Sequence, residues 1–336
     1  MKKKGPKGKS KKHILRNILM FFAFEFVFTA ITAPFIVFRG PFENVKRTVV
    51  GAAMTTLKHQ YIAKAFLSDS EIKEILGKSE IDSTRQQNVN SLSSFANNHD
   101  DSIEREDISD GTKFKGYMLI VHDPTRVKVG YSKKLGVAGE LTSNIAKDNN
   151  AVAAINGGGF TDSSSKDSEW TGTGGEPVGL LMSNGKILHN DEKDNNKKQQ
   201  VMAITKEGQL LVGYHSLNEL KELDVTEAIS FGPALVINGE GTIKSGDGNW
   251  GIAPRTAIGQ RKDGAILMLV IDGRQTTSVG ASLRDVQNIM IKYGAVNATN
   301  LDGGSSSTMY YKGKVINNPC DPLGERSVPS AIYVAQ

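Results

Sequence analysis

The feature that most constrains this chain is an apolar run close to its N-terminus. Residues 18–38 read ILMFFAFEFVFTAITAPFIVF, and Glu25 is the one charged residue among them. A membrane-spanning helix needs roughly 20 apolar residues, which this run supplies. The sequence therefore predicts a transmembrane anchor over residues 18–38, preceded by a basic tail over residues 1–17.

The distribution of charge predicts the orientation of this anchor. Eight basic residues come before the span, whereas only Arg39, Lys46 and Arg47 lie soon after it. The positive-inside rule then places the tail in the cytoplasm and the remainder of the chain outside the cell. A cleaved signal peptide ending near Ala33 is the alternative, but Pro34 follows directly and the apolar run is longer than a usual signal core.

Composition excludes several classes of protein. The whole chain has a formal net charge of +5, but from residue 39 onward 33 basic residues are balanced by 35 acidic ones. Without a basic face, nucleic-acid binding is excluded. Cys320 is the single cysteine, so the chain forms no internal disulfide, and there is no Cys/His cluster of the kind that binds zinc.

Residues 39–110 divide into two parts. Up to about residue 80, apolar positions recur at helical spacing and Ser68 can cap a helix, which predicts a helical stalk. Residues 81–110 are rich in Ser, Asn, Asp and Gln, which favours an extended polar linker. We therefore expect a fragment that starts near residue 110 to fold alone.

Residues 111–336 contain short apolar runs separated by Gly, Asn, Asp and Ser turns. The runs have the length of strands. The clearest helix follows Ser282, a good capping residue, and stops at Gly294. The pattern predicts an α+β domain with strand-rich mixed sheets and few helices.

Three of the predicted strands end in a polar residue followed by glycine. The strands lie in the segments AVAAINGGGF, LMLVIDGR and VNATNLDGGSSS, and their polar end residues are Asn156, Asp272 and Asp302. A single NG or DG is more often a simple turn than a site. Three such ends could gather in one cleft, where free glycine amides would bind an anionic oxygen.

These segments belong to a longer ordered pattern with GPALV, PRTAIG and ERSVPSAI. In order and spacing the pattern resembles the phosphodiester glycosidase family over about residues 114–336. Gly159, Phe160 and Ser305 depart from the family's usual aromatic pair and third glycine, although small residues preserve access to the backbone. The resemblance implies hydrolysis of the bond between a sugar's anomeric carbon and a phosphate that is esterified to a second group.

The implied reaction assigns roles to residue types. A carboxyl group assists water or acts as the nucleophile, while cationic or amide donors hold the phosphate. The catalytic candidates are Asp272, Asp302 and Glu325, with the acid, base and nucleophile left open. The substrate-binding candidates are Asn156, Gly157, Gly158, Arg255, Arg274, Gly303, Gly304, Ser305 and Arg326.

Some candidates have structural alternatives. Arg255 could form an internal ion pair that organises loops, and Glu325 with Arg326 could be a local salt bridge. Ser305 does not indicate a serine hydrolase, because GGSSS lacks the GxSxG elbow. Residues 161–177, which include Trp170, form either a substrate-contacting loop or a solvated one.

We therefore expect a single-pass membrane protein with an extracellular catalytic domain, at a bacterial cell surface given the Lys-rich anchor and the lack of disulfides. Its expected substrate is a cell-envelope glycan or teichoic-type polymer with sugar-phosphate linkages. No cofactor is expected, and a structural divalent ion would need scattered ligands. The competing interpretation is a non-catalytic module that binds envelope polysaccharide or assists its export.

Overall fold

The computed structural model describes residues 9–54, 60–77, 80–89, 94–95, 99–111, 113–161 and 173–336. The chain divides into two compact units, Met1–Gly77 and Lys78–Gln336. Residues 1–8 of the expected basic tail, and Trp170, lie outside the described residues.

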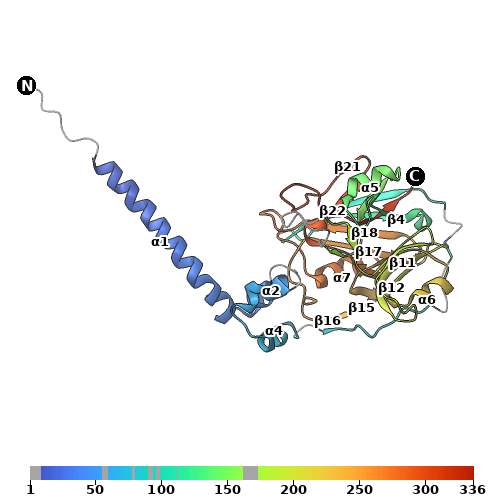
Figure 1. Ribbon diagram of the computed structural model, residues 1–336, viewed down its shortest axis with the longest axis horizontal. Helices are drawn as coiled ribbons and strands as arrows, with labels where there is room; N and C mark the ends of the chain where they lie inside the picture. Colours follow the sequence, from blue (N-terminus) through green and yellow to red (C-terminus); the bar gives the residue numbers. More distant parts are fainter. Residues whose placement is uncertain are drawn as a thin grey trace, which may run out of the picture. The chain divides into compact units, whose positions relative to one another are not determined.

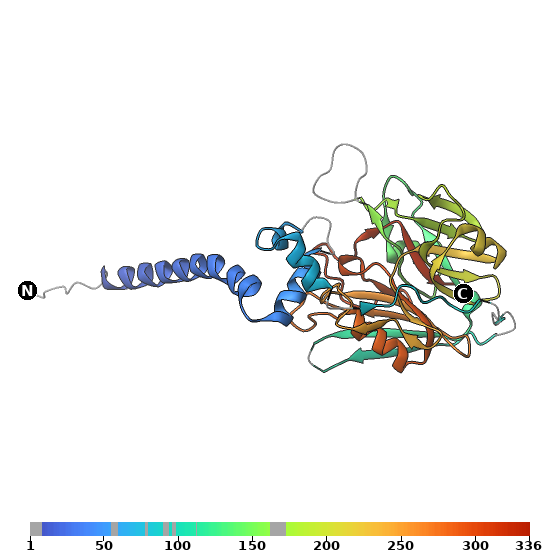
Figure 2. The ribbon, with the colours of Figure 1, turned by 90° about the horizontal axis from the view of Figure 1, so that it is seen from below.

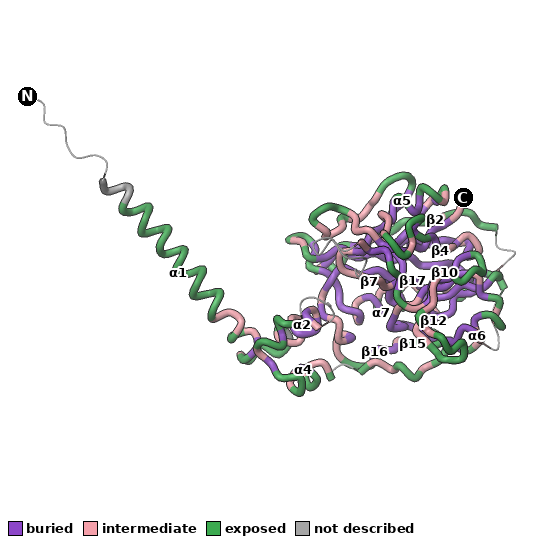
Figure 3. The backbone as a smooth tube through the Cα atoms, viewed as in Figure 1, coloured by how far each residue is buried: buried purple, intermediate pink, exposed green. Residues whose placement is uncertain are grey.

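The first unit is helical. Helix α1 (Lys9–Arg39) contains the predicted span, and an 18-residue stretch within His13–Arg39 has a mean hydropathy of 2.0. Almost all of this apolar segment is exposed, as the green colour of α1 in Figure 3 shows. Such a helix is compatible with a single-pass membrane anchor or with a signal sequence. Three short helices follow, namely α2 (Glu43–Met54), α3 (Tyr61–Lys64) and α4 (Asp69–Leu76).

The short helices and the end of α1 share a small apolar core. Phe66 stacks on Phe38 with 5.1 Å between ring centroids, and Arg39 donates a 2.7 Å hydrogen bond to the Phe66 carbonyl. Ser68 caps α4 in a reciprocal capping box with Glu71, because both have the side-chain oxygens that this motif needs. The predicted stalk is thus a packed helical cluster.

The described residues of the second unit form three large antiparallel sheets. The first has seven strands in the order β15–β14–β19–β17–β18–β3–β2, the second five in the order β10–β9–β13–β11–β12, and the third five in the order β21–β20–β6–β23–β4. Smaller pairs join β1 to β16, β5 to β22, and β7 to β8. The strand-rich α+β architecture predicted from sequence is confirmed (Figure 1).

The strand bounds of the seven-stranded sheet are β15 (Glu240–Gly241), β14 (Ala234–Ile237), β19 (Ala295–Asn300), β17 (Arg255–Arg261), β18 (Ile266–Ile271), β3 (Lys115–Val121) and β2 (Ile103–Ser109). Those of the second sheet are β10 (Lys186–Asn190), β9 (Leu180–Ser183), β13 (Val225–Ser230), β11 (Gln199–Thr205) and β12 (Leu210–His215). Those of the third are β21 (Lys314–Val315), β20 (Met309–Tyr311), β6 (Ala153–Asn156), β23 (Ser330–Val334) and β4 (Val127–Tyr131). The paired short strands are β1 (Glu80–Ile81), β16 (Ile243–Ser245), β5 (Glu140–Leu141), β22 (Ser327–Val328), β7 (Phe160–Thr161) and β8 (Glu176–Pro177).

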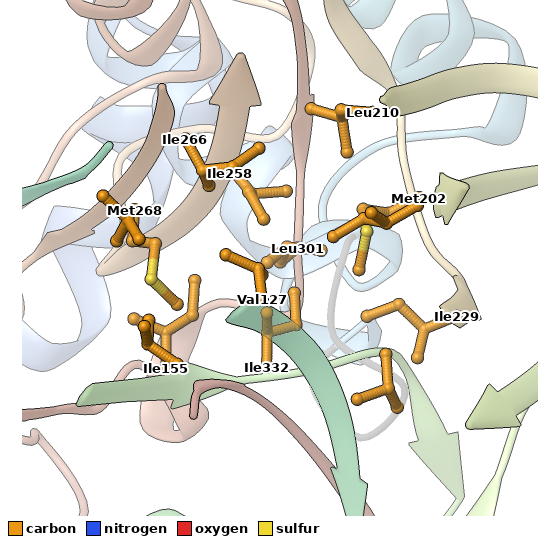
Figure 4. Close-up of a cluster of buried hydrophobic side chains, with 14 of the residues drawn as sticks. Val127, Ile155, Met202, Leu210, Ile229, Ile258, Ile266, Met268, Leu301 and Ile332 are labelled. Carbon is orange, nitrogen blue, oxygen red and sulfur yellow. The ribbon is translucent and has the colours of Figure 1, made fainter. Parts of the chain in front are cut away.

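One apolar core joins the inner faces of all three sheets. Side chains from β17 and β18 point toward those from β11, β6 and β23, as Figure 4 shows for Ile258, Met268, Met202, Ile155 and Ile332. Figure 2 shows the orange strands of the seven-stranded sheet and the yellow-green strands of the second sheet as separate layers. Burying these β-branched and long apolar residues at roughly 25 cal/mol per Å² is the main force that holds the layers together.

Helices cover the outer faces. Helix α7 (Leu283–Lys292) packs on the outer face of the seven-stranded sheet, with Val286 and Met290 fully buried. Ser282 caps this helix, as the sequence predicts, and it does so in a capping box with Asp285. Helix α6 (Leu217–Glu222) covers the second sheet through Leu220, and α5 (Thr142–Asp148) covers the third through Ala146.

The expectation of an extended polar linker over residues 81–110 is wrong at strands β1 and β2. Strand β2 pairs along its whole length with β3 as the edge of the seven-stranded sheet, and β1 pairs with β16. Ile108 is the buried residue of β2, and the strand's other positions are at least partly exposed. An edge strand on the surface needs few apolar residues, and charged side chains protect it from pairing with other chains, so its sequence reads as a linker.

Gln87, also within the expected linker, closes part of the edge of β12. Its side chain donates to the Leu210 carbonyl (3.0 Å) and accepts from the Val212 amide (3.0 Å). Gln260 of β17 accepts from the Leu210 amide (2.8 Å) in the same manner. Two buried glutamine side chains therefore replace a neighbouring strand, and they connect β12 to the rest of the unit.

We expect Gln87→Ala to lower the free energy of unfolding of the second unit by about 1–3 kcal/mol, because it leaves a buried carbonyl and amide without partners. Urea unfolding of the full chain in detergent measures the effect. Gln86→Ala is the matched control, since Gln86 is exposed. Equal stability of the two variants would contradict the proposed role of Gln87.

Candidate active site

The site forms where three strands meet at the beginning of β17. Strand β17 lies between β18 and β19 and is antiparallel to both. Its first residue, Arg255, pairs with Ile271 at the end of β18, and the Leu301 amide donates to the Thr256 carbonyl (2.9 Å). Residues that follow β18 and β19 therefore emerge on either side of the beginning of β17.

Asn156, at the end of β6, joins the third sheet to this point. Its Nδ2 donates a 2.6 Å hydrogen bond to the Asp302 carbonyl, and its Oδ1 accepts from the Thr256 hydroxyl (2.8 Å) and the Thr308 amide (3.2 Å). The Asn156 side chain is fully buried, so these bonds satisfy groups that could not otherwise reach water. Asn156 therefore positions the loop that holds Asp302.

Asp272 is buried, with 5% of its surface exposed. Its Oδ1 accepts from Asn317 Nδ2 (3.1 Å) and from the Asn318 amide (3.0 Å). Burial raises the pKa of the Asp272 carboxyl above its usual range, while the two hydrogen bonds act in the opposite direction. Its Oδ2 accepts no hydrogen bond from the part of the chain that the structure describes, so a proton carried there faces no competing donor.

Asp302 differs from Asp272 in its exposure. Residues 302–305 are all of intermediate exposure, so part of Asp302 reaches solvent. Asn317 Nδ2 also donates to the Ser307 carbonyl (3.0 Å), and Ser307 Oγ lies 3.2 Å from the Thr256 hydroxyl. One hydrogen-bonded network therefore connects Asp272 and Asp302. Asp272 is buried in it, and Asp302 is partly exposed.

Two arginines present cationic groups beside this loop. The Arg274 guanidinium is so near Gly304 that an ideal Cβ there would lie 3.3 Å from Nη2. Arg326 Nη1 donates to Ser305 Oγ (3.0 Å), and its guanidinium lies 5.0 Å from the ring centroid of Phe160. A planar guanidinium can bind phosphate oxygens in bidentate fashion.

Arg255 has the loop-organising role that the sequence left open, although through carbonyls instead of an ion pair. It donates to the carbonyls of Ala281 (3.0 Å), Trp250 (2.9 Å) and Gly251 (2.7 Å). Burial, and to a smaller extent the charge of Arg274, lower the pKa of Arg255 to about 10, so it stays cationic at neutral pH. Arg255 therefore holds the loop before β17.

Glu325 also has a structural contact. Its Oε2 accepts from the Ser143 amide (2.9 Å) in the first turn of α5, where the helix has no side-chain cap of its own. A carboxylate at this end of a helix also interacts favourably with its dipole. The contact favours a capping role for Glu325 over the expected catalytic one.

The amides of Gly157, Gly158 and Gly304, which we expected to be free for substrate, are already engaged in hydrogen bonds. Gly157 and Gly158 donate to the carbonyl and hydroxyl of Ser330, and Gly304 donates to the Pro254 carbonyl (2.9 Å). The glycines are needed for close packing instead: an ideal Cβ on Gly303 would lie 2.8 Å from the Pro254 oxygen. Glycine at 303 thus allows the end of β19 to approach the beginning of β17.

Sequence reasoning did not single out Thr256, Ser307 or Asn317. Thr256 lies in PRTAIG, a motif that indicated the family without indicating which residue bonds to Asn156. Asn317 lies in a stretch with no pattern of its own, and it reaches Asp272 through tertiary structure. The one sequence signal for Asn317 is that an amide side chain lies near the ends of predicted strands, and this signal is weak.

A cavity of about 140 Å³ lies elsewhere, between residues 86–89, β12 and α6. Its lining includes His215, whose pKa burial lowers, and the ion pair of Lys198 with Glu219 (2.6 Å). Glu219 also forms the capping box of α6 with Ser216. These charged groups therefore stabilise one another and the start of α6.

Comparison with known proteins agrees with this geometry. The family model for phosphodiester glycosidases matches residues 149–335, which is more than half of the chain. The matched segment contains Asn156, Asp272 and Asp302. This chain belongs to the phosphodiester glycosidase family.

Individual relatives are similar over parts of the chain. The bovine (Bos taurus) N-acetylglucosamine-1-phosphodiester alpha-N-acetylglucosaminidase is 29% identical over 164 residues, which is 44% of this chain and 30% of that protein. The Bacillus subtilis SPbeta prophage-derived protein YomE is 40% identical over 82 residues, or 24% of this chain and 13% of that protein. The chain thus spans less than a third of the length of these relatives.

A solved structure extends the similarity to the fold. The catalytic domain of zebrafish N-acetylglucosamine-1-phosphodiester alpha-N-acetylglucosaminidase, auto-inhibited by its pro-peptide, superposes with a TM-score of 0.57 at 26% identity. The match covers 73% of this chain and 87% of the zebrafish chain. The sheets described above are therefore the fold of a catalytic domain in that relative.

We expect Asn317→Ala to raise the pKa of Asp272 further, because the Asn317 amide stabilises the ionised carboxylate. Carboxyl ¹³C NMR of selectively labelled protein follows the titration directly. Asn318→Ala is the control. The substitution removes a side chain that donates a hydrogen bond to Gln275, and it retains the backbone amide that donates to Asp272. An unchanged titration in Asn317→Ala would contradict the role of this hydrogen bond.

Proposed function

We propose that the second unit hydrolyses the bond between the anomeric carbon of a sugar and a phosphate diester. The observation that carries the proposal is the emergence of Asp272 and Asp302 on either side of the beginning of β17, with Arg274 and Arg326 beside the loop 302–305. The chemistry needs a carboxyl pair and a cationic site for phosphate, and this arrangement supplies both.

The different surroundings of the two aspartates suggest their roles. Asp272, whose pKa is raised by burial, keeps its proton to higher pH than an ordinary aspartate and acts as the general acid. It protonates the departing phosphate oxygen as the bond from that oxygen to the anomeric carbon breaks. Asp302 assists the water whose hydroxyl becomes bonded to the same carbon. The products are a free sugar and a phosphate monoester.

Arg274 and Arg326 bind the phosphate in this proposal. Arg274 has a left-handed backbone conformation (φ 58°) and an exposed side chain, and Arg326 is braced by Phe160 and Ser305. A braced guanidinium loses little conformational entropy when it binds an anion. The reaction as written uses water alone and needs no cofactor.

The substrate class rests on the relatives and on location. The bovine and zebrafish relatives are named for N-acetylglucosamine 1-phosphodiesters, which supports N-acetylglucosamine as the first sugar to test. The exposed apolar span in α1 and the basic residues before residue 18 support a membrane anchor with the second unit outside the cell. A bacterial envelope glycan or teichoic-type polymer with sugar-phosphate links is the substrate that fits this location.

The location is testable in intact cells. We expect protease added outside to digest residues 78–336 while an epitope tag before residue 9 stays protected. A mature N-terminus near Pro34 would indicate a cleaved signal sequence, and protection of the C-terminal unit would contradict the topology.

The activity is testable with the methyl diester of N-acetylglucosamine 1-phosphate. We expect the unaltered chain to release N-acetylglucosamine and methyl phosphate, and Asp272→Asn and Asp302→Asn each to reduce turnover by about 10²–10⁴-fold, because asparagine keeps the shape but loses the proton chemistry. The matched control is Asp263→Asn, in the turn between β17 and β18 at the opposite end of these strands, where Asp263 is exposed and paired with Arg261.

Two results would overturn the assignment. If both aspartate variants hydrolyse the diester at normal rates, the carboxyl pair is not catalytic. If the unaltered chain and both variants bind envelope polysaccharide equally well without hydrolysing any diester, the chain is a non-catalytic binding module. Thermal unfolding of each variant must accompany these assays, because strand-end aspartates also bond to backbone groups.

A further inference from the structure

An aromatic pair lies beside the strand-end network and has no role in the chemistry described above. Phe231 precedes β14 and Trp250 lies in the loop before β17. Their ring centroids are 6.0 Å apart and their planes are inclined by 72°, an edge-to-face arrangement. Both residues are of intermediate exposure, so part of each ring reaches the surface of the second unit.

Phe231 adjoins the glycine loop that follows Asn156. An ideal Cβ on Gly159 would lie 3.2 Å from Phe231 Cε2, and one on Gly158 would lie 3.0 Å from the Ser230 carbonyl oxygen. Residues 230–231 therefore run directly against the loop. A side chain at residue 159 would press on the Phe231 ring, and glycine there keeps the space beside the ring open.

Trp250 adjoins the other side of the site. Its carbonyl accepts from Arg255 Nη2 (2.9 Å), and the carbonyl of the neighbouring Pro254 accepts from the Gly304 amide (2.9 Å). The buried Arg255 thus fixes the Trp250 loop to the same backbone segment that holds residues 303–304. The two aromatic rings come from different segments, and both are fixed to parts of the active site.

Asn300 provides a polar group at the same junction. Its Nδ2 donates to the Gly232 carbonyl (3.0 Å), immediately after Phe231, and Asp302 follows it by two residues. Its Oδ1 is buried and accepts no hydrogen bond from any residue that the structure describes. A buried acceptor without a partner is unfavourable, and an ordered water would satisfy it.

We infer that Phe231 and Trp250 form the subsite for the sugar ring of the substrate. A pyranose has an apolar face of C–H groups, and a partly exposed aromatic pair beside the site complements this face. The subsite deepens the proposed function and rests on it: the arginines bind the phosphate and the aromatic pair positions the sugar. It predicts selectivity for the sugar that is independent of the phosphate.

Trp250 gives a direct optical test, because the chain has two tryptophans and Trp170→Phe leaves Trp250 as the only one. In this background the probe is methyl α-N-acetylglucosaminide, which has the sugar and no phosphate. We expect a saturable change in the emission of Trp250 with the glycoside and none with methyl phosphate. Phe231→Leu should weaken the affinity for the glycoside by about tenfold, equivalent to about 1.4 kcal/mol.

Tyr214→Leu is the matched control, because Tyr214 is a partly exposed aromatic residue that lines the separate cavity beside β12. It should leave the affinity for the glycoside unchanged. The absence of any emission change up to the solubility limit of the glycoside would overturn the inference, and so would an equal change with methyl phosphate. An equal loss of affinity in Phe231→Leu and Tyr214→Leu would overturn it as well.

The emission test does not require turnover. A saturable glycoside signal in a chain that hydrolyses no diester would support the subsite and contradict the proposed hydrolysis. Hydrolysis without any glycoside signal would support the function and overturn the subsite. The two proposals therefore fail in distinguishable ways.

Discussion

The hydrogen bond from the Thr256 hydroxyl to Asn156 is the interaction on which the candidate site depends. Thr256 belongs to the seven-stranded sheet and Asn156 to the third sheet, so this buried bond is a directional link between two layers that share an apolar core. Asn156 uses its remaining amide group to hold the Asp302 carbonyl. A directional bond fixes position in a way that apolar packing, which is not directional, cannot.

The same junction separates the environments of the two aspartates. Asp272 lies under the loop that contains Asn317 and is buried, whereas Asp302 lies on a loop of intermediate exposure. Because burial disfavours the charged form of a carboxyl group, similar residues can take different protonation states at one pH. The buried Arg255 contributes by fixing the loop before β17, so the charges that face solvent are those of Arg274 and Arg326.

Much of the fold was predictable from local sequence. The strand-length apolar runs, the capped helix after Ser282 and the apolar α1 depend on composition and short-range spacing, which act within one element. The linker prediction failed at β2, because an edge strand with one buried position has the composition of a loop. The prediction that the Gly157 and Gly158 amides are free was also wrong, because both donate hydrogen bonds to Ser330. Ser330 is distant in sequence, so local patterns could not reveal these bonds.

The sequence by itself determined the strand-rich α+β class, the family and the three strand ends that carry Asn156, Asp272 and Asp302. Only the tertiary structure decided what each charged group does. It directed Arg255 to backbone carbonyls and Glu325 to the first turn of α5, and it brought Asn317 to Asp272. The physical reason is that a side chain's role is set by its burial and hydrogen-bond partners, and these come from strands far apart in the chain.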